Sequence, residues 1–343
     1  MLLWAGCSVD TAGLGDRDGS GELDAATDAF GARDARASLD GGDGGGLPDG
    51  GRIDAEAPDA ERLADAGPDP CVDLPIPDTF AACPFGAPRR IDLLSETDAT
   101  DDDPTLTADL LEMYFNSDRP GGEGYADVYV SRRDSVSDPW GAPRLVAGLS
   151  TSVGETTPEI SEDGLTIWVA SDQAGGEGDA DIWRWTRPDR DSSWGGRTRI
   201  AELSTRERDV GAAPSRDGLW VTVSIRPAGG GDWDLYLSSR ASRSATWGAL
   251  LPIAELNTAG VELDGYLDAT ALHLFFDTDF GTGDRDLVVA SRADLGSSFA
   301  PAVRIPGVNS AEGEEDPWLS RDRRYIVFAS ARDGSMDLFE AWR

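Results

Sequence analysis

Histidine and cysteine are scarce in this chain. Its 343 residues include one histidine, His273, and three cysteines, Cys7, Cys71 and Cys83. A catalytic triad or a cysteine–histidine pair would have to use His273, and a metal site with several histidines is excluded. The cysteine spacing does not match the paired CxxC ligands of a structural zinc site, and three cysteines are too few for a disulfide-built fold. Several classes of enzyme and of zinc protein are therefore excluded.

Lysine is absent and positive charge is in short supply. The chain has 64 acidic residues against 30 basic ones, all of them arginine, and its formal net charge is -34. Such a charge repels nucleic acid and anionic lipid surfaces within the screening length, so we expect no nucleic-acid partner. A hydrophobic content of 39% is compatible with a folded core.

The first seven residues, MLLWAGC, are apolar and end in two small residues before Cys7. They resemble the end of a bacterial lipoprotein signal, in which this cysteine is lipidated, although Trp4 stands where leucine is usual and the charged region of an export signal is missing. We expect residues 1–7 to be the remnant of such a signal and the protein to be exported and lipid-anchored in the cell envelope through Cys7. The alternative is a short apolar start that arose by chance.

Residues 8–70 are dominated by Asp, Ala and Gly, a composition that buries too little apolar surface to offset the entropy of ordering. We predict a disordered acidic tether there, followed by an entry segment, residues 71–83, bracketed by two cysteines. In an oxidising compartment Cys71 and Cys83 would form a disulfide that closes this segment, whereas in a reducing one they would be free thiols.

A repeat of about fifty residues dominates the rest of the chain. Each of its five units contains a start that usually includes proline, an apolar run, a turn of small residues, and an aspartate before a second apolar run. These aspartates are 54, 53, 52 and 51 residues apart: Asp127, Asp181, Asp234, Asp286 and Asp337. The regular spacing predicts one structural unit per repeat.

Each unit contains four short segments of strand composition, the fourth lying between units as in residues 139–151. Asp163-Gly164 and Asp217-Gly218 are typical two-residue hairpin turns. We therefore predict an all-β fold, a five-bladed β-propeller of four-stranded antiparallel blades over residues 84–343. The last unit lacks its fourth strand and a spare copy stands at residues 84–96, so this N-terminal strand is predicted to complete the fifth blade.

The repeats resemble the WD40-like (PD40) repeat of TolB-type bacterial propellers. The resemblance is clearest at residues 115–133, FNSDRPGGEGYADVYVSRR, and residues 308–320, VNSAEGEEDPWLS. It implies an interaction module of the periplasm or outer membrane. We accordingly expect a monomeric, non-enzymatic binding or scaffold propeller, with an envelope protein or peptidoglycan glycan as partner at the channel mouth and membrane contact only through Cys7.

Four units carry a carboxylate three residues before the proline or its equivalent: Asp101, Glu155, Glu262 and Glu314. Gly211 breaks the set in the third unit. Equivalent positions of a propeller form a ring, so these acids could gather at the channel mouth and bind a cation such as Ca²⁺, or a basic peptide. The alternative is that each acid bonds the backbone of its own blade. We expect no other cofactor.

Two further functions stay open. Five-bladed propellers include glycoside hydrolases and lyases, which need unlike carboxylates around a sugar pocket, and a propeller can also be purely structural. A pocket with acids and aromatics that break the repeat would favour an enzyme, whereas an evenly symmetric channel would favour binding or structure. The repeated aspartates are predicted to be turn or inter-blade hydrogen-bonding residues. Trp140, Trp194 and Trp247 are predicted to pack the blades, with sugar stacking as their alternative role, and His273 to point outward without chemistry.

Overall fold

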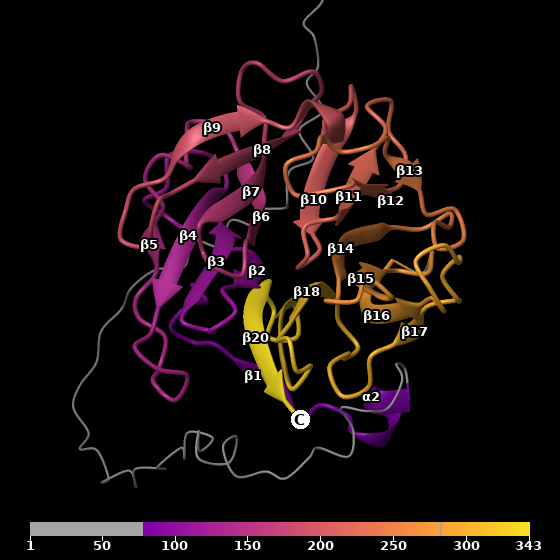
Figure 1. Cartoon of the computed structure of the whole chain (residues 1–343). Coiled ribbons are helices and arrows are strands. Elements are labelled where there is room, and N and C mark those ends of the chain that lie inside the picture. Colours follow the sequence, from indigo (N-terminus) through magenta and orange to yellow (C-terminus); the bar gives the residue numbers. More distant parts are fainter. Residues whose placement is uncertain (1–77, 282) are drawn as a thin grey trace, which may run out of the picture. The chain divides into compact units, whose positions relative to one another are not determined.

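Segments in which Val, Ile, Phe, Tyr and Trp recur are bounded by Gly, Asp and Ser, the composition of strands joined by tight turns. The computed structural model describes residues 78–281 and 283–343, and there these segments form five four-stranded antiparallel sheets arranged around a centre (Figure 1). The predicted five-bladed propeller is confirmed.

Four blades take all their strands from one repeat. Blade 1 contains β2 (Asp101–Leu106), β3 (Glu112–Ser117), β4 (Asp127–Arg132) and β5 (Arg144–Leu145). Blade 2 contains β6 (Glu155–Ile160), β7 (Thr166–Ser171), β8 (Asp181–Thr186) and β9 (Gly195–Arg199). Blade 3 contains β10 (Arg208–Pro214), β11 (Trp220–Arg226), β12 (Asp234–Ser239) and β13 (Leu251–Pro252). Blade 4 contains β14 (Glu262–Leu267), β15 (His273–Thr278), β16 (Asp286–Ser291) and β17 (Val303–Arg304).

Blade 5 joins the two ends of the described chain. Its strands β18 (Glu314–Leu319), β19 (Tyr325–Ser330) and β20 (Asp337–Trp342) are completed by β1 (Arg89–Arg90), which pairs antiparallel with β20. The inner strands of neighbouring blades contact one another around the whole ring, including β18 with β2. The prediction that the N-terminal strand closes the ring is confirmed.

The short helix α2 (Asp78–Ala82) precedes β1 and packs on the ring through Phe80. The Phe80 ring stacks on Phe85 at 5.6 Å between centroids and meets the edge of Phe275 in blade 4 at 6.0 Å. Cys83, at the end of this segment, is disulfide-bonded. The other two cysteines, the tether of residues 8–70 and the proposed lipidation site lie outside the described residues, so the pairing with Cys71 stays a prediction.

The turns follow the sequence signals in part. Gly164 and Gly218 have φ values of 73° and 67°, which a side chain at either position would disfavour. The predicted two-residue turns are corrected, because residues 161–165 and 215–219 join the strands and neither Asp163 nor Asp217 has a positive φ. Asp127 accepts hydrogen bonds from the Glu123 and Gly124 N–H groups, at 2.8 and 3.1 Å, which confirms its role as a turn residue. Within the described part of the chain, no helix is long and apolar enough to span a membrane.

Candidate functional site

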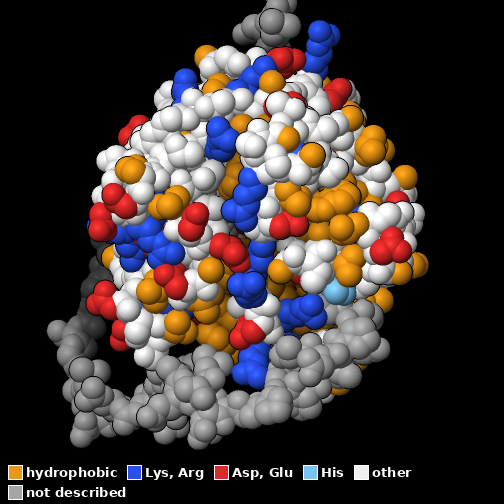
Figure 2. Space-filling model, viewed as in Figure 1, with side chains coloured by type: hydrophobic (Ala, Val, Ile, Leu, Met, Phe, Trp, Pro, Cys, Tyr) orange, Lys and Arg blue, Asp and Glu red, His pale blue; other side chains and the backbone are white. Residues whose placement is uncertain are grey.

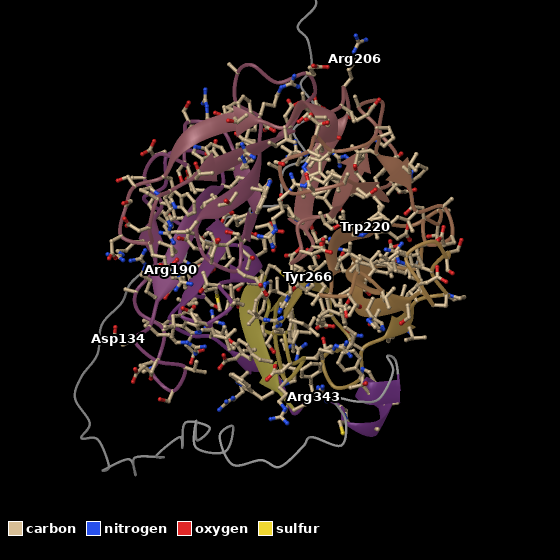
Figure 3. All side chains as sticks on the ribbon, in the orientation of Figure 1. Asp134, Arg190, Arg206, Trp220, Tyr266 and Arg343 are labelled. Atoms are coloured by element: carbon tan, nitrogen blue, oxygen red, sulfur yellow. The ribbon has the colours of Figure 1, made fainter. Side chains whose placement is uncertain are left out.

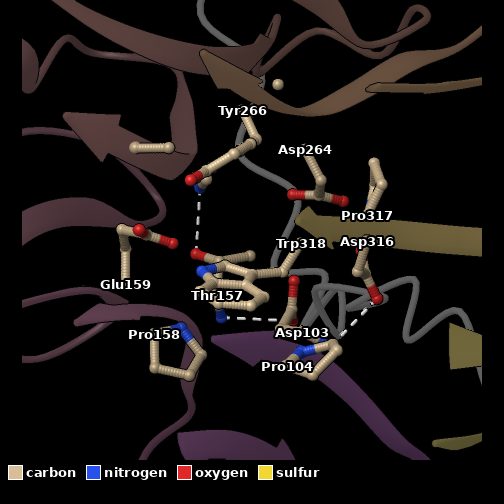
Figure 4. Close-up of a pocket in the computed structure, with 13 residues that line it drawn as sticks. Asp103, Pro104, Thr157, Pro158, Glu159, Asp264, Tyr266, Asp316, Pro317 and Trp318 are labelled. Atoms are coloured by element: carbon tan, nitrogen blue, oxygen red, sulfur yellow. Dashed lines mark hydrogen bonds between the residues drawn. The ribbon is translucent and has the colours of Figure 1, made fainter. Parts of the chain in front are cut away.

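Every inner strand has a bulge in its middle, where the pairing with the second strand skips. The bulged residues all have φ between 48° and 61°, and four of them are not glycine: Asp103, Thr157, Gly211, Asp264 and Asp316. A left-handed conformation costs on the order of 1 kcal/mol in a non-glycine residue. The five residues line a narrow pocket of about 40 Å³ at the centre of the ring (Figure 4).

Hydrogen bonds link the bulged residues from blade to blade. The Asp103 N–H donates to Asp316 Oδ2 at 2.9 Å, the Thr157 N–H to Asp103 Oδ2 at 3.2 Å, and the Gly211 N–H to Thr157 Oγ1 at 2.9 Å. Gly211 has no side chain that could accept the next hydrogen bond of this series. The Asp264 N–H donates instead to Ser224 Oγ at 3.1 Å. These bonds satisfy backbone donors that the bulges remove from the sheet.

Carboxylates crowd one side of this pocket. Two groups of three have oxygens within 4.8 Å of one another, Asp102 with Asp103 and Asp316, and Asp264 with Asp277 and Asp316. Burial, reinforced by the neighbouring acids, raises the pKa of Asp102, Asp103 and Asp264 well above the ordinary value, and burial raises that of Asp277 to about 8. These are the described acids close enough to share a cation, and oxygen ligands of this kind suit Ca²⁺.

Arg285 partly neutralises the cluster. Its Nη1 lies 3.0 Å from Asp277 Oδ2, and its Nη2 pairs with the Glu315 carboxylate. The attraction of this guanidinium lowers the pKa of Asp277, but burial outweighs it. The cluster is therefore held by one arginine and by protonation of some of its carboxyl groups at neutral pH.

The four acids predicted to form a channel-mouth ring lie elsewhere. Glu155 Oε2 accepts the Thr151 N–H at 2.7 Å, Glu262 Oε2 the Thr258 N–H at 2.8 Å, and Glu314 Oε2 the Ser310 N–H at 2.7 Å. Asp101 Oδ2 likewise accepts the Glu96 N–H at 2.7 Å. All four acids are almost fully buried and none lines the channel pockets. The cation ring of Asp101, Glu155, Glu262 and Glu314 is corrected: these acids bond the backbone that enters their own blades.

The ring of capping acids is also complete, contrary to the expectation that Gly211 breaks it. Asp209 accepts the Thr205 N–H at 2.5 Å and the Thr205 hydroxyl at 2.9 Å, as Glu155 does from Thr151. Pro214 follows Asp209 by five residues, whereas Pro158 follows Glu155 by three. An alignment anchored on proline therefore selects the wrong residue in blade 3.

A second, wider cavity of about 400 Å³ opens beside the central pocket, mainly between blades 2 and 3. Aromatic, acidic and basic side chains line it, among them Trp168, Glu159, Arg184 and Arg216. Tyr266 and Trp318, from blades 4 and 5, line both this cavity and the central pocket. Tyr266 lies near the centre of the ring in Figure 3. Mixed apolar and polar walls of this kind are typical of ligand sites.

The residues that follow the bulges do not obey the repeat. The equivalent position of the five inner strands, four residues after the capping acid, holds a different residue in every blade: Thr105, Glu159, Ala213, Tyr266 and Trp318. Four of the five line a channel pocket, the exception being Thr105. Sequence reasoning missed these residues, and the available signal was the failure of the repeat at one aligned position.

Among these channel residues, Glu159 has a carboxyl group whose pKa is strongly shifted. Burial raises the pKa of its carboxyl to about 8, although the hydrogen bond from Thr105 and the charge of Arg216 both lower it. Arg216 Nη1 lies 2.8 Å from Glu162 Oε1, so that guanidinium already has an acid partner. Figure 4 shows Glu159 across the pocket from Asp264 and Asp316.

The remaining predicted residues have structural positions. Trp140 and Trp247 are buried, beneath the guanidinium groups of Arg133 and Arg240 at 4.1 and 4.0 Å from their ring centroids, which supports their predicted packing role. His273, which was predicted to point outward, has a mostly buried side chain.

The side chain of His273 is 14% exposed and its Nδ1 lies 2.8 Å from Asp268 Oδ2. Arg323 Nη2 is 3.3 Å from the same oxygen. The histidine therefore belongs to a surface-edge cluster of blades 4 and 5 and does not line the two central pockets.

Comparisons with known proteins agree with the fold. No family model and no curated protein matches the chain. Among solved structures, a putative TolB from Agrobacterium tumefaciens is 18% identical, with a TM-score of 0.43 over 71% of this chain and 76% of that one. TolB from Acinetobacter baumannii is 13% identical, with a TM-score of 0.45 over 75% and 63%. An endo-arabinase from Bacteroides thetaiotaomicron is 12% identical, with a TM-score of 0.52 over 76% and 97%. The likeness to the endo-arabinase supports the fold alone.

Proposed function

We propose that this chain is a non-enzymatic binding propeller of the bacterial cell envelope that engages a protein or cell-wall partner at the channel mouth. The proposal places the lipid anchor at Cys7 and uses residues 8–70 as the tether that holds the propeller away from the membrane. The observation that carries it is the cavity of about 400 Å³ beside the central pocket.

The cavity has the character of a recognition site. Its volume falls within the range of about 300 to 1,000 Å³ that is usual for ligand pockets. Trp168 and Tyr266 offer aromatic surface, and arginine and glutamate side chains offer donors and acceptors that would fix the orientation of a bound group. A symmetric structural ring would not require unlike residues at one level of the channel.

A glycoside hydrolase is the second candidate, and Glu159 favours it. A carboxyl group with a pKa of about 8 is protonated at neutral pH, as the general acid of such an enzyme must be. The same reaction needs an ionised carboxylate as base or nucleophile. Burial raises the pKa of Asp103 and Asp264, which share the pocket with Glu159, well above the ordinary value. Because the raised pKa disfavours the ionised form of both carboxyl groups, we rank hydrolysis below binding.

Binding and hydrolysis can be measured on the same samples. Soluble peptidoglycan fragments and arabinan oligosaccharides would be titrated by calorimetry, and the products would be followed by chromatography. We expect binding of a peptidoglycan fragment without turnover, weakened in Trp168→Ala and kept in Leu251→Ala, a change at an exposed side chain of β13 outside the cavity.

Glu159→Gln separates the two candidates. A hydrolase would lose turnover in this variant while it kept binding, so turnover of either substrate that disappears in Glu159→Gln would replace the binding proposal with the enzymatic one. Unchanged binding in Trp168→Ala, with the variant folded as judged by its thermal melt, would move the partner's site away from the cavity.

A further inference from the structure

The first residue of the second strand occupies an equivalent place in all five blades, facing the groove toward the next blade. Five different residues stand there: Glu112, Thr166, Trp220, His273 and Tyr325. An arginine that follows the third strand is repeated in the same way: Arg133, Arg187, Arg240, Arg292 and Arg343. The contacts between these two sets differ from groove to groove.

An ion pair closes the groove between blades 1 and 2. Glu112 Oε2 lies 2.5 Å from Arg187 Nη2, and Glu112 Oε1 lies 2.8 Å from Arg132 Nη2. The Glu112 and Arg187 side chains are only 4% and 2% exposed. A carboxylate thus occupies the space in front of the repeated arginine, and it satisfies two guanidinium groups at once.

Large aromatic side chains take this place in two other grooves. The Arg292 guanidinium lies 4.8 Å from the ring centroid of Trp220 between blades 3 and 4. Tyr325 is fully buried beside Arg133 between blades 5 and 1. In both grooves a large aromatic side chain stands where blade 1 has Glu112. Arg133 also lines a smaller cavity of about 260 Å³, which Tyr325 does not line.

Between blades 2 and 3 the corresponding side chain is Thr166, which is too short to reach the arginine. The cavity of about 400 Å³ lies here, and Thr166 and Arg240 both line it. Arg240 Nε donates to the Gly218 carbonyl at 2.6 Å, and Arg243 donates to the carbonyls of Asp217 and Arg216 at 2.9 and 2.8 Å. Neither forms an ion pair with a carboxylate among the described residues.

A third guanidinium enters the same space. Arg184 lines the cavity from β8, at the position where the other blades have Val130, Leu237, Val289 and Glu340. Its Nε is buried without a hydrogen-bond partner, and within residues 78–281 and 283–343 it forms no ion pair. Burial and the charges of Arg184 and Arg243 lower the pKa of Arg240, which shows how close the three cations are.

The acids that line this cavity are already engaged. Glu162 pairs with Arg216 at 2.8 Å, and Asp163 accepts the Ser161 hydroxyl at 2.6 Å within its own turn. The Glu159 carboxyl has a pKa of about 8 and is mostly neutral at pH 7. In a chain of net charge -34, three arginines in one cavity that have no acid partner within the described part of the chain are therefore a specific feature. In Figure 2, arginine side chains, drawn in blue, lie along the middle of the visible face.

From this comparison of grooves we infer that the cavity between blades 2 and 3 binds the carboxylate of an acidic saccharide, held by Arg184 and Arg240 in the place that Glu112 fills one groove away. The inference rests on the proposed binding function and names its ligand class. Guanidinium groups bind carboxylates through paired, charge-assisted hydrogen bonds.

A saccharide suits the rest of the cavity better than a peptide does. Trp168 offers an aromatic face of the kind on which the apolar face of a sugar ring packs, and the surrounding polar groups can bond its hydroxyls. The volume of about 400 Å³ lies within the range of small-molecule sites. A uronic acid places its carboxylate on the ring itself, so both contacts can be made at once.

Calorimetric titration of the full chain tests the inference, with a glucuronate-containing disaccharide as probe and the matching neutral glucose disaccharide as comparison. We expect the acidic sugar to bind at least about tenfold more tightly, with the preference lost in Arg184→Gln and weakened by salt. Thr166→Glu should abolish binding and raise the melting temperature, because its carboxylate recreates the pairing of Glu112. Arg206→Gln, at an exposed arginine at the edge of the ring (Figure 3), should bind like the wild type.

The outcomes separate this inference from the proposed function. Equal binding of the acidic and neutral sugars, lost in Trp168→Ala, would overturn the carboxylate site and leave a saccharide-binding propeller. Competition by an acidic peptide as strong as that by the glucuronate sugar would overturn the saccharide assignment. If neither sugar nor any peptidoglycan fragment binds, the inference fails together with the glycan form of the proposed function.

Discussion

Thr105 and Glu159 stand at the same position of neighbouring blades, and the Thr105 hydroxyl donates a hydrogen bond to Glu159 Oε2 at 3.1 Å. Thr105 also accepts the Ile160 N–H at 3.2 Å through the same oxygen. The pair ties blade 1 to blade 2 and fixes Glu159 at the wall of the channel. Because this acid is desolvated there, its protonation has measurable consequences.

Stability should fall as Glu159 ionises. The folded-state pKa is raised to about 8 from an ordinary value of 4.5, so between these values the folded protein holds a proton that the unfolded chain has released. The free energy of unfolding therefore declines as pH rises through this window. Glu159→Gln should remove that decline. The free energy of unfolding of the variant, relative to that of the wild type, should therefore be higher at about pH 9 than at about pH 5 by on the order of 2 kcal/mol, after allowance for screening. Denaturant melts at both pH values give the difference.

The control for this measurement is Glu202→Gln, a substitution at an exposed glutamate. It should leave the pH dependence of the wild type unchanged. A Glu159→Gln profile parallel to that of the wild type would show that the carboxyl titrates near its ordinary value.

Removing the charge of Arg285 should destabilise the propeller in a pH-dependent way. Its guanidinium is 3.0 Å from the buried Asp277 carboxylate, and it also pairs with Glu315. Arg285→Met leaves these acids without a cation and should cost about 3 kcal/mol at pH 8. The loss of attraction raises the pKa of both acids further, so at pH 5 they are neutral and the cost should be smaller.

Arg304→Met provides the comparison for Arg285. Arg304 pairs with Asp286 at 2.6 Å, but its side chain is 61% exposed, so its loss should cost less than about 1 kcal/mol at either pH. Equal costs for Arg285→Met at the two pH values would contradict the assignment of raised pKa values to the acidic cluster.

The strand that closes the ring contains a matched pair of arginines. Arg90 Nη2 lies 3.0 Å from Asp337 Oδ1, and the Asp337 side chain is only 2% exposed. Arg90→Ala should lower the free energy of unfolding by about 2 kcal/mol because it leaves a buried carboxylate unpaired. Arg89→Ala, in the same strand but at an exposed position, should change it by about 0.5 kcal/mol or less. Similar effects of the two changes would show that the pair does not hold the closing strand.

Substitution of a capping acid should lower the stability of the propeller and should not change its response to calcium. Glu314 accepts hydrogen bonds from Ser310, Ser330 and Arg332. Glu314→Gln should lower the free energy of unfolding by about 1 to 3 kcal/mol, equally in calcium and in a chelator. Glu312→Gln, at an exposed residue of the same loop, should have little effect. A calcium-dependent melting shift that Glu314→Gln abolishes would restore the channel-mouth cation ring.

The architecture could be predicted from the sequence because each blade repeats one pattern of strands and turns. Asp127 and its four equivalents each begin the third strand of a blade, and Gly164 and Gly218 have the positive φ that the loops between the first two strands need. The spare strand at Arg89–Arg90 could be assigned because one unit lacked its fourth strand. These features depend on local chemistry, which the order of residues specifies directly.

The direction of side chains around the channel could not be read in this way. A bulge in each inner strand breaks the two-residue alternation of the side chains. Glu155 therefore turns into its own blade, whereas Thr157 and Glu159 line the channel. For this reason the four acids cap the backbone of their own blades instead of forming the ring that their spacing suggested. Asp209 does the same in blade 3, although its distance from the proline differs.

What the sequence by itself determined is the number of blades, their strands and the closure of the ring, because local propensity and repetition carry that information. Only the tertiary structure decided which residues meet across blades. Thr166 and Arg240 line the same cavity although they are 74 positions apart in the chain. The space between them exists because a short side chain stands where Glu112 closes the groove one blade earlier, and packing of this kind depends on contacts that no single repeat contains.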